Sequence, residues 1–212
     1  MDALKHLLNH NHALANIMRL QPAANERLPP KYLWIDCVDN DVLPNHILGL
    51  SRSEILVYRN LAHQINHIDL NCLSVLEYAV QVLAVKHIIV CGHYDCGMLL
   101  PSAQYDPAEL AKNWLYPVQM TALKYQAQLS AYQPDVLRLE KLCDLNVIEQ
   151  VVQLANTTVV QRTWKNQQEL CLHGWVYSPT TSLLKDLAVD MGSEMEVMRV
   201  YESAVAACLG NA

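Results

Sequence analysis

The sequence has no run of basic residues, no long uninterrupted apolar segment and no stretch typical of a secretory signal. Its 21 acidic residues outnumber its 15 lysines and arginines, so nothing in it attracts a phosphate backbone and no nucleic-acid partner is expected. The most apolar long segment, residues 72–90, contains Glu77, Gln81 and Lys86, whereas a membrane-spanning helix needs about twenty nearly uncharged residues. Because charged and histidine side chains interrupt the first twenty residues, we expect a cytoplasmic protein with no membrane contact.

The chain also lacks the dense cysteine framework of a small secreted domain. Its seven cysteines are an odd number and are scattered along the sequence, which favours a reducing compartment. In that setting, closely spaced cysteine and histidine residues are metal ligands or buried thiols more often than disulfide partners.

Apolar residues in the N-terminal section recur at helical spacing, so residues 1–30 are predicted to form a helical arm. After that arm, short runs rich in β-branched and aromatic residues alternate with helical patterns. The predicted strands are residues 32–37, 55–60, 87–91 and 170–177. An apolar stripe over residues 72–83, with Asn71 as the expected N-cap, predicts a buried crossover helix between the second and third strands.

The alternation of strands and helices predicts an α/β fold with a parallel β-sheet core and flanking helices. Further helices are expected at residues 137–154, 182–187 and 194–209. We find no repeat, low-complexity tract or linker, so residues 1–212 are predicted to be a single domain.

Three candidate zinc ligands follow the ends of two predicted strands. Cys37 ends the first strand, and His93 and Cys96 lie in a glycine-flanked turn after the third. Loops at the carboxyl ends of parallel strands converge, so these side chains are expected to meet. Two thiolates, one imidazole and the carboxylate of Asp39 form a ligand set that suits a tetrahedral Zn²⁺ ion.

A single cysteine at a strand end is usually only a small buried hydrophobic side chain. The five remaining cysteines are assigned to that class: Cys72, Cys91, Cys143, Cys171 and Cys208. The combination of Cys-x-Asp at one strand end with His-x-x-Cys at another is what favours a metal site over buried thiols.

The sequence resembles the β-class carbonic anhydrases over nearly its whole length. The segments that carry the resemblance are LWIDCVD (33–39), VYRN (57–60), NCLSVL (71–76), VKHIIVCGHY (85–94), LCDLNVIEQ (142–150) and HGWVY (173–177). The resemblance implies a zinc enzyme that hydrates carbon dioxide reversibly to bicarbonate, with Cys37, His93 and Cys96 as ligands. It also implies a homodimer or homotetramer in which the N-terminal helices contact a neighbour.

The first motif departs from the family pattern at one position. The family normally has Cys-x-Asp-x-Arg, and its arginine pairs with the aspartate and keeps it off the metal. Here Asp41 stands in place of that arginine. A like charge cannot hold a carboxylate away from a dication, so Asp39 is expected to stay on zinc and to close the position that a catalytic zinc leaves open for water. The catalytic pair of the family is thus represented by Asp39 and Asp41.

Other departures also cluster on the expected pocket. Leu28 stands where a glutamine usually lines the pocket, and Asp36, Asp95 and Met98 stand where glycines are usual. They are expected to crowd a site that binds an anion. The alternative is that they are tolerated changes around a working enzyme.

Trp34, Arg59 and Tyr177 match residues that bind a second, non-catalytic bicarbonate in some bacterial members of the family. An arginine fork beside aromatic groups suits a carboxylate-like anion, and the alternative is core packing around an ordinary arginine hydrogen bond.

Three functions remain open on the sequence. The first is weak or impaired carbon dioxide hydration. The others are a non-catalytic zinc and bicarbonate sensor, or structural partner of an active paralogue, and a hydrolase of another small electrophile such as carbon disulfide or carbonyl sulfide.

Overall fold

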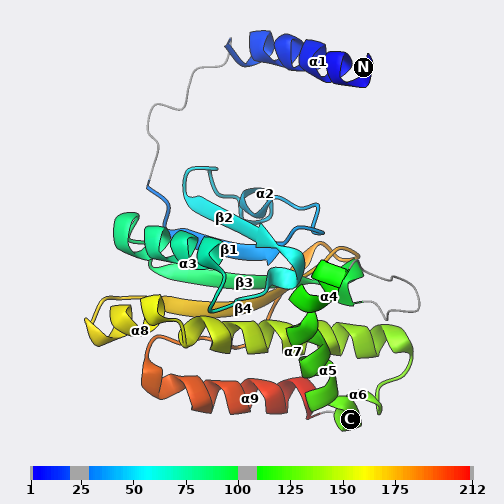
Figure 1. Cartoon of the computed structure of the whole chain (residues 1–212), viewed down its shortest axis with the longest axis vertical. Coiled ribbons are helices and arrows are strands. Elements are labelled where there is room, and N and C mark those ends of the chain that lie inside the picture. Colours follow the sequence, from blue (N-terminus) through cyan, green and yellow to red (C-terminus); the bar gives the residue numbers. More distant parts are fainter. Residues whose placement is uncertain (1, 20–28, 100–108, 211–212) are drawn as a thin grey trace.

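The computed structural model describes residues 2–19, 29–99 and 109–210. A five-stranded sheet with strand order β2-β1-β3-β4-β5 forms its centre (Figure 1). The strands are β1 (Tyr32–Cys37), β2 (Ile55–Asn60), β3 (His87–His93), β4 (Cys171–Ser178) and β5 (Leu183–Asp186). The first four strands are mutually parallel, and β5 is antiparallel to β4. The α/β prediction with a parallel sheet core is confirmed.

Helices follow the strands in the order expected of crossover connections. The larger ones are α1 (Asp2–Arg19), α3 (Leu70–Glu77), α5 (Tyr116–Lys124), α7 (Asp135–Ala155), α8 (Thr158–Lys165) and α9 (Val197–Leu209). Shorter ones are α2 (Pro44–Leu48), α4 (Glu109–Trp114) and α6 (Gln126–Leu129), with single turns η1 (Leu61–His63), η2 (Tyr78–Val82), η3 (Gly97–Leu99) and η4 (Glu194–Glu196). Within the described residues, no helix is both long enough and apolar enough to cross a membrane.

The main core lies between one face of the sheet and the helices α3, α7 and α8. Alternate residues of β1, namely Leu33, Ile35 and Cys37, point into this core, because successive side chains of a strand face opposite sides. Helix α7 contacts β3 and β4, and α9 packs against α7 (Figure 1). A smaller cluster around Trp34 and Tyr177 covers the other face.

Two local expectations are wrong. Residues 182–187 were expected to be helical, but Leu183–Asp186 form strand β5, because this short segment completes the sheet edge beside β4. The crossover helix begins at Leu70, and its N-cap is Asp69, whose Oδ1 accepts the Asn71 amide at 3.0 Å. Both errors arise where pairing or capping, rather than apolar periodicity, sets the structure.

The helical arm is described in part. Helix α1 covers residues 2–19, and residues 20–28, including Leu28, lie outside the described residues. The apolar side chains Leu4, Leu7, Leu8 and Leu14 have exposed fractions of 69%, 61%, 62% and 43%. This stripe is therefore available for contact with another surface.

Candidate metal centre

The three predicted zinc ligands come together at the carboxyl ends of β1 and β3. Cys37 is the last residue of β1 and His93 the last of β3, and these strands are hydrogen-bonded neighbours. The Sγ atoms of Cys37 and Cys96 lie 3.8 Å apart. Their ligand atoms and a ring nitrogen of His93 all lie within 4.8 Å of one another, and all three residues are buried. Among the described residues, this is the only cluster of three or more potential metal ligands that the structure contains.

The spacing of the two sulfur atoms fits zinc. Thiolates about 2.3 Å from a tetrahedral Zn²⁺ ion are about 3.8 Å from each other, and the two cysteines have that separation. Two soft thiolates and one imidazole are donors that zinc sites use, including catalytic sites with three protein ligands. The residues present therefore fit this metal.

The imidazole of His93 is prepared to act as a ligand through Nε2. Its Nδ1 lies 3.1 Å from the carbonyl oxygen of Tyr94, to which a protonated Nδ1 donates. This bond leaves the lone pair on Nε2, which is buried and has no hydrogen-bond partner among the described residues. A buried nitrogen without a partner is costly unless something binds it. A metal ligand whose other ring nitrogen bonds a carbonyl is the usual arrangement of zinc-bound histidine.

Electrostatics favour deprotonation of one thiol of the pair. The hydrogen bond from Cys96, acting against burial, lowers the pKa of Cys37 to about 5. The amide of Ala62 also donates to Cys37 Sγ at 3.2 Å. The same sulfur contact, together with burial, raises the pKa of Cys96. Burial disfavours the charged imidazole, but the neighbouring Cys37 thiolate outweighs it and the pKa of His93 is raised. A bound dication would favour the deprotonated form of both thiols and the neutral form of the imidazole.

The turn that carries His93 and Cys96 is shaped by close packing on α7. A Cβ atom at Gly92 would lie 2.7 Å from Cγ2 of Val147 and 3.1 Å from Sγ of Cys143, so only glycine fits there without movement. Asp95 has φ +61°, in the left-handed region that favours glycine. Asp95 is exposed and lines a cavity of about 250 Å³ together with His93 and Cys96, so its effect on the site stays a prediction.

Asp39 lies beside the cluster, and Asp41 follows it by two positions in the sequence. Oδ2 of Asp39 accepts the backbone N–H of Gly97, the residue after Cys96, at 2.7 Å. Asp39 is not among the residues whose ligand atoms gather within 4.8 Å, and both aspartates are exposed. The role of Asp39 as fourth ligand and the effect of Asp41 remain predictions.

Asp36 lies on the opposite side of β1 from the metal ligands. The structure corrects the expectation that this residue crowds the metal pocket, because its fully buried carboxylate pairs with Arg59 at 3.2 Å. Asn40 Nδ2 donates to both of its oxygens at 3.1 Å. Burial raises the pKa of Asp36, and Asn40 and Arg59 act against that rise.

The predicted bicarbonate residues lie on this same face. Trp34 and Tyr177 are buried in the smaller cluster, and Nε1 of Trp34 has no hydrogen-bond partner in the described part of the chain. The guanidinium of Arg59 donates to the carbonyl oxygens of Asn40, at 2.6 Å, and of Val42. An anion at Arg59 would therefore compete with the Asp36 carboxylate, and bicarbonate binding here stays a prediction.

Sequence reasoning missed a second buried carboxylate near the site, Asp144 on α7. It contacts Tyr94, the residue between His93 and Asp95, and Lys185 of β5. The only available signal was one acidic residue within the mostly apolar run of residues 142–148. That pattern marks a buried polar group but does not identify its partners.

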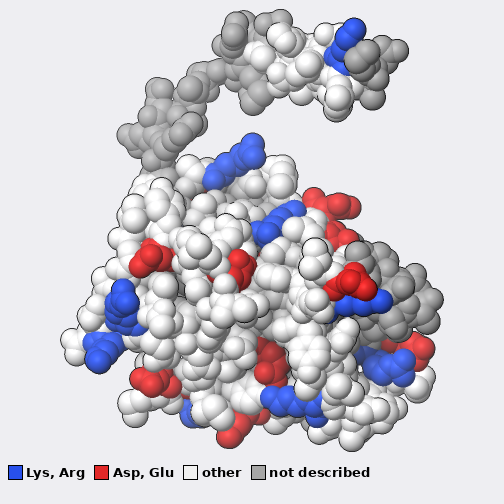
Figure 2. Space-filling model, viewed as in Figure 1, with Lys and Arg blue, Asp and Glu red and all other residues white. Residues whose placement is uncertain are grey.

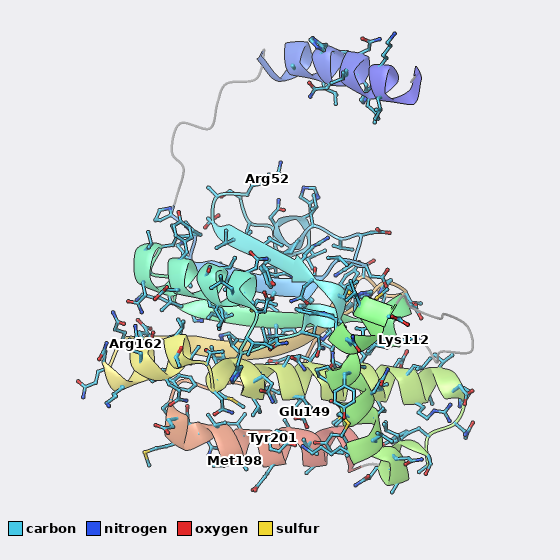
Figure 3. All side chains as sticks on the ribbon, in the orientation of Figure 1. Arg52, Lys112, Glu149, Arg162, Met198 and Tyr201 are labelled. Carbon is cyan, nitrogen blue, oxygen red and sulfur yellow. The ribbon has the colours of Figure 1, made fainter. Side chains whose placement is uncertain are left out.

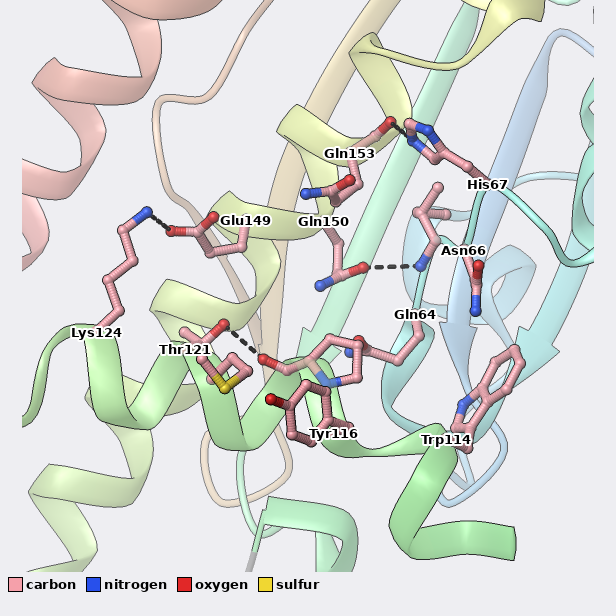
Figure 4. Close-up of a pocket in the computed structure, with 13 residues that line it drawn as sticks. Gln64, Asn66, His67, Trp114, Tyr116, Thr121, Lys124, Glu149, Gln150 and Gln153 are labelled. Carbon is pink, nitrogen blue, oxygen red and sulfur yellow. Dashed lines mark hydrogen bonds and ion pairs between the residues drawn. The ribbon is translucent and has the colours of Figure 1, made fainter.

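Within the described part of the chain, the surface also contains a large groove, but its polar groups pair with one another. A groove of about 680 Å³ lies between α5, α7 and the segment after η1 (Figure 4). Its charged residues Lys124 and Glu149 pair with each other at 2.8 Å, and Gln150 accepts the Ile65 amide at 2.7 Å. On the face drawn in Figure 2, acidic and basic side chains are interspersed among the described residues, with no broad patch of one sign. That distribution agrees with the absence of basic runs in the sequence.

Comparison with known proteins gives one consistent family. A family model described as carbonic anhydrase matches residues 32–184. A carbonic anhydrase from Emericella nidulans is 37% identical over 173 residues, covering 81% of this chain and 76% of the relative. A carbonic anhydrase from Pseudomonas aeruginosa is 34% identical over 157 residues, covering 71% of this chain and 70% of the relative.

Solved structures agree in fold. A β-carbonic anhydrase from Coccomyxa, in complex with acetazolamide, has a TM-score of 0.78 at 32% identity, over 92% of this chain and 91% of that one. A tetrameric β-carbonic anhydrase from Sordaria macrospora has a TM-score of 0.79 at 27% identity, over 91% and 100% of the two chains. With the family model, the relatives and the fold in agreement, this chain belongs to the β-carbonic anhydrase family.

Proposed function

We propose that this protein binds one zinc ion per chain through Cys37, His93 and Cys96 and hydrates carbon dioxide reversibly to bicarbonate at a reduced rate. The observation that carries the proposal is the buried pair of sulfur atoms 3.8 Å apart beside Nε2 of His93, to which no described residue is hydrogen-bonded. Relatives named carbonic anhydrase add support.

The protein's own groups would prepare the site for such a metal. Two thiolates offset the charge of a dication, and the Ala62 amide stabilises the negative charge on Cys37. The Tyr94 carbonyl holds the tautomer of His93 that leaves Nε2 free. When bound in such a site, zinc acts as a Lewis acid and can lower the pKa of a coordinated water to roughly 7.

The reduced rate is attributed to positions 39 and 41. Asp39 is proposed as the fourth ligand at neutral pH, since its carboxylate already lies at the amide next to Cys96. Asp41 offers no cation to draw Asp39 away. A carboxylate on the metal would occupy the position that water needs.

Stopped-flow measurement of carbon dioxide hydration tests the activity. We expect the zinc-loaded protein to hydrate carbon dioxide faster than both the metal-free protein and the Cys96→Ser variant. Its rate should be about tenfold or more below that of the Pseudomonas aeruginosa relative. A tenfold difference in rate corresponds to about 1.4 kcal/mol in the activation barrier. No zinc-dependent hydration would favour the bicarbonate sensor or structural partner. Hydrolysis of carbon disulfide or carbonyl sulfide without carbon dioxide hydration would favour the third function.

The assembly and location proposed are a cytoplasmic homodimer or homotetramer built from one domain with an N-terminal helical arm. The exposed apolar stripe of α1 and the tetrameric relative from Sordaria macrospora support the assembly.

A bicarbonate ion between Trp34, Arg59 and Tyr177 is proposed as a second ligand. Tighter bicarbonate binding by Asp36→Asn than by wild type, measured by tryptophan fluorescence, would support that pocket.

A further inference from the structure

Asp144 is a buried carboxylate whose two oxygens are engaged by different elements. Only 1% of the residue is exposed. Its Oδ1 accepts the hydroxyl of Tyr94 at 3.0 Å, and its Oδ2 accepts Nζ of Lys185 at 2.7 Å. Lys185 Nζ also donates to the Tyr94 hydroxyl at 3.1 Å. The three groups form a closed triangle joining α7, β5 and the turn after β3.

Tyr94 occupies a special place in that turn. It directly follows His93 and lies two residues before Cys96. Its carbonyl accepts Nδ1–H of His93, and its amide donates to the carbonyl of Tyr177 at 3.0 Å. The residue that fixes the His93 tautomer is therefore held both at its backbone and at the end of its side chain.

Helix α7 contacts the same turn through the neighbour of Asp144. Sγ of Cys143 donates to the carbonyl oxygen of His93 at 3.3 Å. One turn of α7 thus restrains both His93 and Tyr94. The group that hydrogen-bonds the second ring nitrogen of a histidine ligand sets the orientation and basicity of the imidazole. For His93 that group is the carbonyl of Tyr94, and Tyr94 is itself held by residues of α7 and β5.

We propose that Asp144 and Lys185 are positioning residues for the metal centre, acting through Tyr94. By clamping the phenol, they keep the Tyr94 carbonyl on Nδ1–H of His93, so that the Nε2 lone pair faces the two thiols. The proposal rests on the proposed zinc site but does not depend on hydration activity.

Helix α7 offers a matched control. Glu149 Oε1 accepts Lys124 Nζ at 2.8 Å and the hydroxyls of Tyr125 and Tyr201 at 2.8 and 2.9 Å. Glu149 and Tyr201 are labelled in Figure 3, where α7 faces α9. This cluster joins helices as the Asp144 triangle joins its elements, but in the described residues it has no hydrogen bond to residues 93–97, which carry His93 and Cys96. A purely structural role would give both clusters the same effect.

The test compares Tyr94→Phe, Asp144→Asn and Glu149→Gln with wild type in the full-length protein. Zinc affinity is measured by chelator competition, ligand geometry by the visible spectrum of the cobalt-substituted protein, and stability by thermal unfolding. We expect Tyr94→Phe and Asp144→Asn to weaken zinc binding about tenfold and to shift the cobalt bands. Glu149→Gln should lower the melting temperature but leave the zinc affinity and the cobalt spectrum unchanged.

Equal loss of zinc affinity in Glu149→Gln, or unchanged affinity and cobalt spectrum in Tyr94→Phe, would overturn the positioning role. Tyr94→Phe removes only a hydroxyl, so it keeps the test decisive if Asp144→Asn fails to fold. A wild-type protein that binds zinc but hydrates no carbon dioxide would contradict the proposed activity alone. A wild-type protein that binds no zinc would overturn both.

Discussion

At the scale of single residues, Asp36 and Asp41 differ in burial and in the charge proposed to act beside them. Asp41 is exposed and follows Asp39 by two positions in the sequence. Asp36 is fully buried, and its charge is offset by Arg59 and by two hydrogen bonds from Asn40. Asp36 and Asp39 therefore have different surroundings, since Asp36 pairs with Arg59 on one face of β1 and Asp39 accepts the amide of Gly97, next to Cys96.

Asp41→Arg is expected to raise carbon dioxide hydration. A guanidinium at this position can form a bidentate pair with Asp39 and release the fourth metal position. We expect an increase of about tenfold, equivalent to about 1.4 kcal/mol, most clearly above pH 8, in stopped-flow assays. Asp41→Asn is the control, because it removes the like charge without supplying a partner. Wild-type activity equal to that of ordinary relatives would show that Asp41 does not close the site.

Arg59→Met is expected to destabilise the fold strongly. Removing the guanidinium leaves the Asp36 carboxylate buried without its charged partner, which costs about 3–5 kcal/mol. The double variant Asp36→Asn, Arg59→Met should be more stable than the single variant. Denaturant unfolding measures both free energies. A single variant within about 1 kcal/mol of wild type would mean that the pair contributes little.

At the scale of elements, strands were predictable where apolar runs are continuous. Residues 32–37 and 55–60 match β1 and β2, and β3 and β4 differ from their predicted bounds by one or two residues. Strand β5 was not predictable, because its four residues are ordered by pairing with β4 rather than by their own pattern. The metal ligands follow from motifs at strand ends. The clamp of Asp144 and Lys185 does not, because their contact depends on how α7 and β5 pack.

Helix α1 is expected to mediate assembly. Its exposed leucines would be costly to leave in water and can be buried against a second chain. Light scattering at micromolar concentration should report a dimer or larger species. The variant with Leu7→Gln and Leu8→Gln should dissociate more readily, whereas His12→Gln on the same helix should not. A strictly monomeric wild-type protein would contradict this role of α1.

At the scale of the whole molecule, stability should fall in acid partly through His63. Burial, with a smaller contribution from His93, lowers the pKa of His63 to about 3, while the unfolded chain has a value of about 6.5. Between these values the unfolded state binds the proton and the folded state does not. The contribution of neutral, buried His63 to the free energy of unfolding is therefore present above pH 6.5. It is lost as the pH falls towards 3, by up to about 1.4 kcal/mol per pH unit.

His63→Gln should make this pH dependence shallower while keeping an acceptor for the amide of Asn146, which lies 2.9 Å from Nε2 of His63. Urea unfolding between pH 7 and pH 4 measures the slope. Identical slopes in the two proteins would show that His63 is protonated in the folded state or is not buried as described.

Zinc content tests the central claim most directly, because hydration, the role of Asp41 and the Tyr94 clamp all depend on the ligand set. Elemental analysis of purified protein should find about one zinc per chain. Cys37→Ser, His93→Ala and Cys96→Ser should each lose it, because each removes one of three buried protein donors that meet within 4.8 Å. Stoichiometric zinc retained by any two of these variants would contradict the site.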